Sequence, residues 1–309
     1  MTATGPTVRH VQVRVPATSA NIGSGFDIFG LALQLYNTFT FTVTAASEWS
    51  VSLPPDSRLP AQGDNLVWRA ARRLFDHVGF HLAGLHLRLD IDIPLGRGLG
   101  SSASAIVGGL VAANTIAGNR LDRDALLALA VELEGHPDNV TPALVGGMTL
   151  SYTLASEHRY VALPVPEDVQ IIVAIPDFQL NTAKARAVLP ARISRQDAVF
   201  NGSRTALLVA ALYERRYELL AAAMDDRLHQ PYRAALVPGM TGAIAAGYAA
   251  QALGVALSGA GPTLIAFAQG AGDTVATALH GAFAQQGVSC ETRLLRADSK
   301  GAVVVEATP

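Results

Sequence analysis

Residues 94–105, which read Pro-Leu-Gly-Arg-Gly-Leu-Gly-Ser-Ser-Ala-Ser-Ala, constrain the fold of this chain more than any other stretch. Before them, residues 86–93 alternate leucine or isoleucine with polar residues, a period of two that predicts a half-buried strand. After the glycines, residues 101–114 are mostly small or aliphatic and predict a buried helix, with Ser101 as its N-cap. The sequence therefore predicts a strand, a glycine-rich turn and a helix in direct succession.

Three glycines alternate along this turn, at Gly96, Gly98 and Gly100. Glycine adopts left-handed backbone conformations at little cost, and its missing side chain lets a ligand approach backbone N–H groups. The helix that follows directs its free N–H groups and its positive dipole end toward the turn, which favours an anion. We predict a phosphate cradle; the simpler alternative is a turn that only joins a strand to a helix. The turn has neither the Gly-Lys of a Walker A loop nor the spacing of a dinucleotide fingerprint.

Composition limits the classes of protein that remain. The chain has 309 residues, of which 50% are hydrophobic and 16% charged, so one large or two ordinary domains with a substantial core are expected. A net charge of −2 gives no electrostatic footprint for nucleic acid, and no apolar run reaches the roughly 18 residues of a membrane span. The single cysteine, Cys290, excludes an internal disulfide and a cysteine metal cluster. With no recognisable leader, we expect a cytoplasmic protein with no nucleic-acid or membrane partner.

Alternating patterns predict the strands of the first half. Residues 11–15 and 39–43 alternate apolar and polar side chains, which suits an antiparallel or mixed sheet better than a doubly wound parallel one. Pro16 is predicted to end the first of these strands, followed by a loop over residues 17–27.

Helices are predicted on both sides of the glycine turn. One spans residues 66–78 and starts near Asp64 or Asn65, and another is capped by Asp122 and stops near Gly135. Glu134 then lies at a helix C-terminus, where a carboxylate is electrostatically disfavoured, which makes it a candidate for a function. A solvated surface glutamate is the alternative.

Three prolines, at 164, 166 and 176, flank the apolar strand predicted at residues 169–175 and suggest a domain boundary. The pattern beyond this boundary predicts an α/β sandwich with helices on one face. Its predicted helices span about 197–213, 216–228, 239–252 and 273–286, and its strands 256–257, 263–267 and 288–295, the last being the closing strand.

Three motifs, in the expected order, resemble the signatures of the GHMP kinase superfamily: residues 16–23, 94–105 and 257–263. Within that superfamily the sequence is most similar to the homoserine kinases. The further segments that carry this similarity are residues 24–27, 134–140, 182–186 and 229–233.

The resemblance implies an α+β GHMP kinase fold with the active site between two domains. Residues 1–165 would form the N-terminal ATP-binding domain, with a left-handed crossover, and residues 166–309 the C-terminal, ferredoxin-like domain. It implies an ATP- and Mg²⁺-dependent phosphorylation of the L-homoserine side-chain hydroxyl in threonine biosynthesis. A GHMP kinase for another small alcohol, of mevalonate type or a sugar, and a non-catalytic nucleotide-binding protein on the same fold are the alternatives.

The resemblance also implies roles for individual residues. Asn65 would lie near the adenine, and Ser102 and Glu134 would hold magnesium. The phosphates of ATP would contact Pro94, Leu95, Gly96, Arg97, Gly98, Leu99, Gly100, Ser101, Ser102, Ala103 and Ser104. The substrate would be bound by Asn21, Asp27, His136, Thr182, Arg186 and Arg233. The catalytic residues would be Asn139, Arg186 and Glu134.

The resemblance implies catalysis by positioning and electrostatics without an obvious general base, because phosphoryl transfer needs little nucleophilic push. Lys184 lies near the relevant segment and is kept as the alternative. Arg97, within the glycine turn, either contacts phosphate or points to solvent. Homodimers are frequent among similar proteins, so a homodimer is one expected assembly.

Overall fold

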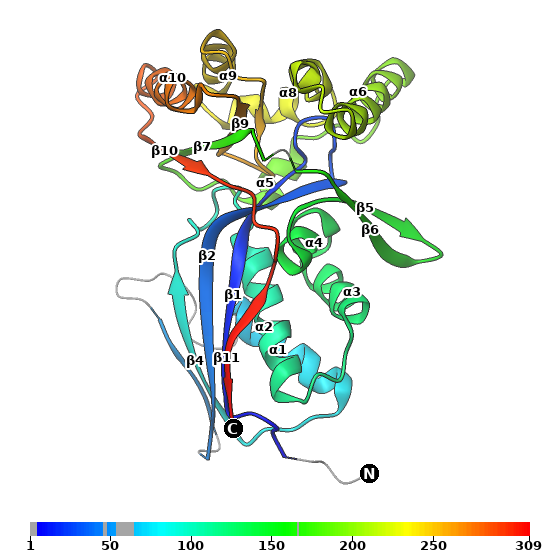
Figure 1. The fold of residues 1–309 in the computed structure, drawn as a ribbon, viewed down its shortest axis with the longest axis vertical. Coiled ribbons are helices and arrows are strands. Elements are labelled where there is room, and N and C mark those ends of the chain that lie inside the picture. Colours follow the sequence, from blue (N-terminus) through cyan, green and yellow to red (C-terminus); the bar gives the residue numbers. More distant parts are fainter. Residues whose placement is uncertain (1–4, 46–47, 54–64, 166) are drawn as a thin grey trace.

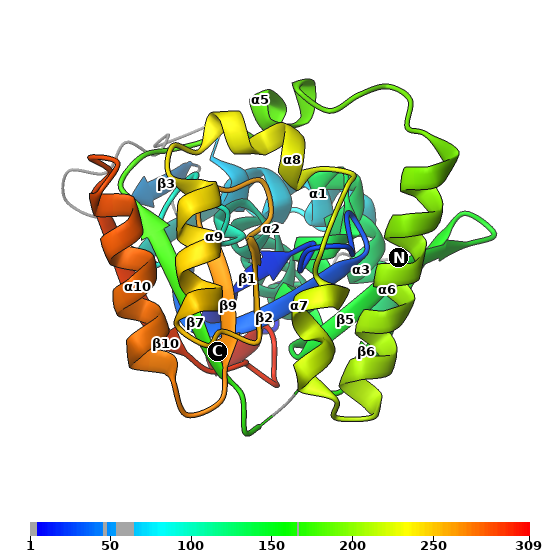
Figure 2. The same cartoon turned by 90° about the horizontal axis from the view of Figure 1, so that it is seen from above.

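The computed structural model describes residues 5–45, 48–53, 65–165 and 167–309. Within these residues the strands form a seven-stranded sheet and a four-stranded sheet, which occupy the lower and upper halves of the molecule in Figure 1. Helices α1 to α4 lie on one face of the larger sheet, and α9 and α10 cover the smaller sheet. Figure 2, seen from above, shows α9 and α10 side by side over the smaller sheet.

The larger sheet is mixed, as the alternating patterns predicted. Its centre is an antiparallel array of β1 (His10–Ala20), β2 (Phe29–Thr44) and β4 (Gly84–Ile91), and β3 (Trp49–Ser52) runs parallel to β4. The hairpin of β5 (Met148–Leu154) and β6 (Glu157–Leu163) joins through β2, and β11 (Val303–Thr308) pairs with β1. One face of each central strand is apolar and packs on the helices, which is why the period is two.

Four helices cover that face: α1 (Leu66–Val78), α2 (Ser101–Ile116), α3 (Arg123–Glu134) and α4 (Pro137–Val145). Asp122 caps α3 with its side chain, as predicted, and α1 starts next to Asn65, whose side chain is its cap. Helix α2 differs from the prediction, because its N-cap is Gly100, with a φ of 67°, and Ser101 is its first helical residue. No side chain of the described residues therefore caps the N-terminus of α2, and its first N–H groups stay open toward the turn.

The smaller sheet has the order β10-β7-β9-β8, with all neighbours antiparallel. Its strands are β7 (Gln170–Pro176), β8 (Gly254–Leu257), β9 (Leu264–Ala268) and β10 (Cys290–Leu295). Helices α9 (Met240–Ala249) and α10 (Gly272–Ala284) cover one face. The other face packs against β2 and against α6 (Arg195–Tyr213) and α7 (Leu220–Ala223). Strand β7 is buried on both faces, which explains its continuous apolar sequence.

Short elements complete the described chain. These are α5 (Thr182–Ala187), the 3-10 turns η1 (Tyr217–Leu219) and η2 (Ala234–Leu236), and α8 (Gln230–Arg233). The helix predicted over 216–228 is therefore wrong: only η1 and α7 form there.

Two further predictions need correction. Strand β1 does not end at Pro16 but continues to Ala20, because the register shifts between Pro16 and Ala17 and the irregularity accommodates the missing N–H of proline. The closing strand is β11 rather than the strand that ends at Leu295, so the last residues return to the larger sheet. Asp64 and Pro166 lie outside the described residues, and the division at 165/166 stays a prediction.

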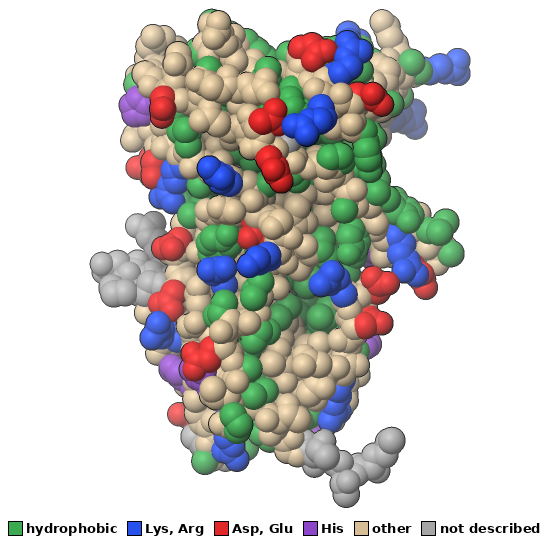
Figure 3. Space-filling model, viewed as in Figure 1, with side chains coloured by type: hydrophobic (Ala, Val, Ile, Leu, Met, Phe, Trp, Pro, Cys, Tyr) green, Lys and Arg blue, Asp and Glu red, His purple; other side chains and the backbone are tan. Residues whose placement is uncertain are grey.

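Basic and acidic side chains are interspersed on the face shown in Figure 3. Among the described helices, none has both the length and the apolar character that crossing a bilayer requires.

Candidate active site

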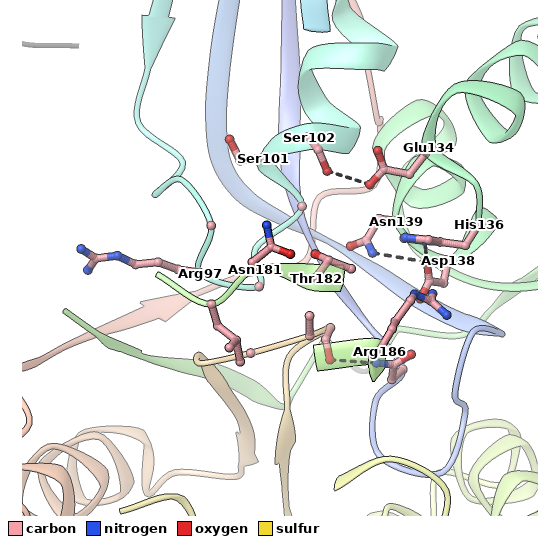
Figure 4. Close-up of a pocket in the computed structure, with 18 of the residues that line it drawn as sticks. Arg97, Ser101, Ser102, Glu134, His136, Asp138, Asn139, Asn181, Thr182 and Arg186 are labelled. Carbon is pink, nitrogen blue, oxygen red and sulfur yellow. Dashed lines mark hydrogen bonds and ion pairs between the residues drawn. The ribbon is translucent and has the colours of Figure 1, made fainter. Parts of the chain in front are cut away.

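A cavity of about 250 Å³ lies where the glycine turn meets the smaller sheet and α5. Figure 4 shows labelled side chains that approach it from α2, α3, the start of α4 and α5, with Arg97 on the glycine turn. The sequence-predicted residues that line it are Asn21, Asp27, Gly96, Arg97, Gly98, Gly100, Ser101, Ser102, Glu134, His136, Asn139, Thr182, Arg186 and Arg233.

The carbonyl groups of the glycine turn are held by residues outside it. The Gly96 oxygen accepts from Leu180 N at 2.9 Å, and the Gly98 oxygen accepts from Ser258 Oγ at 2.6 Å. The Arg97 oxygen accepts a backbone N–H at 3.3 Å, and the Leu99 oxygen accepts another at 3.1 Å. In a trans peptide unit the N–H points in the opposite direction to the C=O of the preceding residue. The N–H groups that follow these four carbonyls are therefore directed away from the groups that bind the carbonyl oxygens.

The N–H groups of residues 97–102 have no acceptor within the described part of the chain. The three glycines have φ values of 65°, 78° and 67°, which confirms their predicted left-handed conformation. Unpaired N–H groups at the start of a long helix form a site for an anion.

A second cavity, of about 350 Å³, lies between the glycine turn, the start of α1 and strands β2 and β4. Gly96, Ser101 and Ser102 line both cavities, so the two cavities meet at the glycine turn. The remaining lining is mostly apolar and includes Asn65 and Leu95.

Ser102 and Glu134 point toward each other from α2 and α3 (Figure 4), and Ser102 Oγ donates to Glu134 Oε1 at 2.7 Å. Burial raises the pKa of Glu134 above its usual value, although the hydrogen bond from Ser102 and the charge of His136 act in the opposite direction. The pair presents hard oxygen atoms beside the anion site. No cluster of three or more histidine, cysteine or acidic residues suited to a metal occurs within the described residues.

The start of α4 holds a chain of hydrogen bonds. Asp138 accepts from His136 Nδ1 and, at 3.3 Å, from Asn139 Nδ2, and Thr18 Oγ1 donates to Asn139 Oδ1 at 2.8 Å. Burial alone would lower the pKa of His136, but the hydrogen bond and charge of Asp138 and the charge of Glu134 outweigh it and raise that pKa.

Asp27 and Arg186 form a bidentate pair across the cavity, with N–O distances of 2.8 and 3.0 Å. Arg186 projects from α5, and Asp27 belongs to the loop after β1, where its φ of 57° is left-handed. Asn21 Oδ1 accepts the Asp27 N–H, while Asn21 Nδ2 donates to Gly259 O. The loop is thereby tied to the third sequence motif.

Arg233 is 2% exposed, yet no carboxylate pairs with it among the described residues. Its Nε donates to Ala185 O at 3.1 Å, and its Nη1 donates to Gly259 O at 3.0 Å and lies 3.3 Å from His229 Nδ1. Burial and, secondarily, the charge of Arg186 lower the pKa of Arg233 to about 10. A buried guanidinium held by neutral groups is a receptor for an anion.

Some of the predicted ATP residues do not line the first cavity. Asn65 and Leu95 line the second one, and the Asn65 side chain also caps α1. Leu99 and Ala103 are buried, each within a hydrophobic core. Ser104 is fully buried, where its hydroxyl donates to Ser101 O and accepts from Asn37 Nδ2.

Pro94 lines neither cavity, and its predicted contact with ATP stays a prediction. Arg97 extends away from the serines (Figure 4) and pairs with Asp177, so it does not simply point to solvent, and its contact with phosphate stays a prediction.

The sequence prediction did not assign functional roles to Thr18, Asp138, Asn181 or Gly259. Three of these form hydrogen bonds within the site, and Asn181 lines the cavity and caps α5. Thr18, Asp138 and Gly259 lie within motifs that the resemblance identified, so their position was available from the sequence, but their contacts were not.

Comparisons with known proteins identify the family of this chain. The chain matches the family models described as GHMP kinases N terminal domain, over residues 65–147, and GHMP kinases C terminal, over residues 208–285. Homoserine kinase from Halothermothrix orenii is 44% identical over 94% of this chain and 95% of the relative. Homoserine kinase from Desulfitobacterium hafniense is 46% identical over 96% of this chain and 100% of the relative.

Solved structures give the same result. A crystal structure of homoserine kinase from Cytophaga hutchinsonii superposes with a TM-score of 0.89 at 29% identity, over 99% of this chain and 100% of that one. A mevalonate kinase structure superposes with a TM-score of 0.71 at 15% identity, over 94% and 100% of the two chains, a likeness of fold alone. The chain therefore belongs to the homoserine kinase family of the GHMP kinases.

Proposed function

We propose that this protein transfers the γ-phosphoryl group of ATP to the side-chain hydroxyl of L-homoserine, giving O-phospho-L-homoserine and ADP. The observation that carries the proposal is one cavity that combines three groups: unpaired N–H groups of the glycine turn, a buried arginine with no carboxylate partner among the described residues, and a carboxylate–guanidinium pair. The names of relatives about 45% identical over nearly the whole chain support the same reaction.

ATP fits the two cavities together. The apolar second cavity suits the adenine, and the shared residues Gly96, Ser101 and Ser102 lie where the phosphates would cross the turn. The N–H groups of the turn and the dipole of α2 would then stabilise the phosphate charge.

Ser102 and Glu134 fit a magnesium ion, because both offer hard oxygen ligands and magnesium takes its remaining ligands from phosphates and water. When bound, the ion would neutralise charge on the β- and γ-phosphates. A neighbouring cation would also compensate the charge of the half-buried Glu134 carboxylate at the C-terminus of α3.

The amino-acid end of the substrate complements the charged groups of the cavity. The carboxylate would bind Arg233 and the ammonium would bind Asp27, drawing that carboxylate from its bidentate pair with Arg186. Arg186 would then be free to stabilise the phosphoryl group in the transition state. His136 and Thr182 line the same cavity and would complete the substrate pocket.

The transfer forms a bond between the hydroxyl oxygen and the γ-phosphorus and breaks the bond to the β,γ-bridging oxygen, which keeps its electron pair as ADP leaves. The hydroxyl proton passes to a phosphoryl oxygen. Lys184 is exposed and is not among the residues that line the cavity, and the cavity carboxylates already have hydrogen-bond partners. These features support catalysis by positioning, with Asn139 beside the reacting oxygen, rather than by a general base.

The test is a coupled ADP-release assay with Mg-ATP and, separately, L-homoserine, L-serine, L-threonine, mevalonate and galactose. We expect a rate with L-homoserine far above the others. A rate only with mevalonate or a sugar would keep the phosphate site and overturn the amino-acid site. ADP or ATP binding with no turnover of any alcohol would favour a non-catalytic nucleotide-binding protein.

A Glu134→Gln variant is expected to raise the magnesium concentration for half-maximal rate about 10-fold, because a neutral amide is a weaker ligand than a carboxylate. Initial rates at saturating ATP and L-homoserine, titrated with magnesium chloride, measure the effect. Glu132→Gln is the matched control, since Glu132 lies on the same helix but is exposed and paired with Arg73. Equal magnesium dependence in both variants would contradict a role of Glu134 as ligand.

A further inference from the structure

We propose that Thr18 is a positioning residue that holds the side-chain amide of Asn139 with its nitrogen available to the reacting oxygen atoms. The inference rests on the proposed function for its chemical meaning, and the hydrogen bond on which it depends stands independently of that function. Thr18 lies on β1, is fully buried, and donates from Oγ1 to Asn139 Oδ1 at 2.8 Å.

The surroundings of Asn139 allow one orientation of its amide. Asp138 only accepts hydrogen bonds when ionised, and it already accepts from His136 Nδ1, so the atom of Asn139 beside it must be the nitrogen. The amide oxygen then faces Thr18, whose hydroxyl supplies the hydrogen. Asn139 is 9% exposed and Asp138 is 2% exposed, so an unmatched acceptor there would be costly.

The glycine turn is built closely around this hydrogen bond. A β-carbon on Gly100 would overlap Thr18 Oγ1 and would lie 3.2 Å from Asn139 Oδ1. The backbone N–H of Thr18 also donates to Leu99 O in the same turn. Thr18 thus links β1 to the start of α4 through its side chain and to the glycine turn through its backbone N–H.

The orientation of the Asn139 amide determines whether it presents a hydrogen-bond donor or an acceptor to the substrates. Its Nδ2 carries two hydrogens, of which one donates to Asp138, and Asn139 lines the cavity. The second hydrogen is a donor for the reacting hydroxyl oxygen or for a γ-phosphoryl oxygen. The amide takes no proton, and one lone pair of the hydroxyl oxygen remains for the bond to phosphorus.

Removal of the Thr18 hydroxyl leaves Asn139 Oδ1 without a donor in a buried place and releases the amide to rotate. We therefore expect Thr18→Val, which is nearly isosteric, to lower kcat about 30-fold with less than about a 3-fold change in KM for L-homoserine and ATP. Thr18→Ser keeps the hydroxyl and should retain kcat within about 3-fold. Thr149→Val, at another fully buried threonine of the same sheet, is the matched control and should match the wild type.

The experiment combines steady-state kinetics with NMR of the side-chain amide of Asn139, assigned by its absence in Asn139→Asp. We expect its resonances to shift or broaden in Thr18→Val and to stay in place in Thr18→Ser. Unchanged resonances in Thr18→Val, a kcat equal to the wild type, or a Thr18→Ser variant as slow as Thr18→Val would each overturn the proposal. A parallel rise in KM for ATP with a lowered Tm would also overturn it, since that pattern indicates damage to the turn alone.

Different results would contradict the proposed reaction and the proposed role of Thr18. If the wild type does not phosphorylate L-homoserine but phosphorylates another alcohol, the proposed substrate is wrong, and the same kcat comparison is made with that alcohol. If no alcohol is phosphorylated, the proposed reaction is wrong, and the NMR comparison alone decides whether Thr18 holds the amide.

Discussion

An Arg233→Met variant is expected to lose about 10³-fold in kcat/KM for L-homoserine while its affinity for ADP stays unchanged. Arg233 is buried, and its hydrogen-bond partners among the described residues are neutral, so the carboxylate of the substrate would be its counter-ion. Loss of one partner of a desolvated charge pair costs about 4 kcal/mol, which corresponds to about a 10³-fold change. Methionine keeps most of the volume, so the packing around α8 should survive.

The measurement is kcat/KM from ADP release over a range of L-homoserine, together with ADP binding by calorimetry and Tm. Arg216→Met is the control, because Arg216 lies in the same half of the chain but is exposed and paired with Glu218. Arg233→Lys distinguishes charge from shape: it should recover part of the activity, since lysine keeps the charge but not the bidentate fork. A kcat/KM for Arg233→Met within about 3-fold of the wild type would show that the substrate carboxylate binds elsewhere.

A Gly98→Ala variant is expected to lose about 10²- to 10³-fold in kcat/KM for ATP, because the turn would no longer present its N–H groups together. Gly98 has a φ of 78°, and an added β-carbon would overlap the carbonyl oxygen of Ser258. The Gly98 carbonyl is itself held by Ser258 Oγ, so relief of the overlap must break that contact. The left-handed conformation adds about 1–2 kcal/mol of strain for a residue with a side chain.

The rate as a function of ATP concentration, ADP affinity and Tm together test this expectation. Gly287→Ala is the matched control: Gly287 has a φ of 70°, but apart from its chain neighbours no described residue lies within 4 Å of the added β-carbon. It should lower stability slightly and leave the kinetics unchanged. Normal ATP kinetics in Gly98→Ala would mean that the phosphates do not bind along this turn.

Local sequence patterns predicted the elements that depend on neighbours along the chain. The alternation in β2 and β4, the start of α1 next to Asn65, the cap at Asp122 and the end of α3 near Gly135 all appear in the structure. These features depend on side-chain period and on short-range hydrogen bonds, which a sequence displays directly. The assignment of β1 failed at Pro16 because the register shift that tolerates a proline depends on the partner strand.

The candidate site was found in the sequence by its motifs, but the pairing of its charges was not. The sequence indicated Asp27, Arg186 and Arg233 as one set. Only the fold shows that the first two neutralise each other while Arg233 is left with neutral partners. The sequence also did not reveal the hydrogen bond from the Thr18 hydroxyl to Asn139, because the two residues are 121 positions apart in the chain.

By itself the sequence determined the glycine turn, the helix that follows it, the secondary-structure periods and the family. The tertiary structure decided which way the turn faces, since its carbonyls are held by Leu180, Ser258 and Thr18. It also decided that the last strand returns to β1. The physical reason is that backbone conformation is set within a few residues, whereas the direction of a hydrogen bond and the counter-ion of a buried charge depend on groups that meet only when the chain has folded.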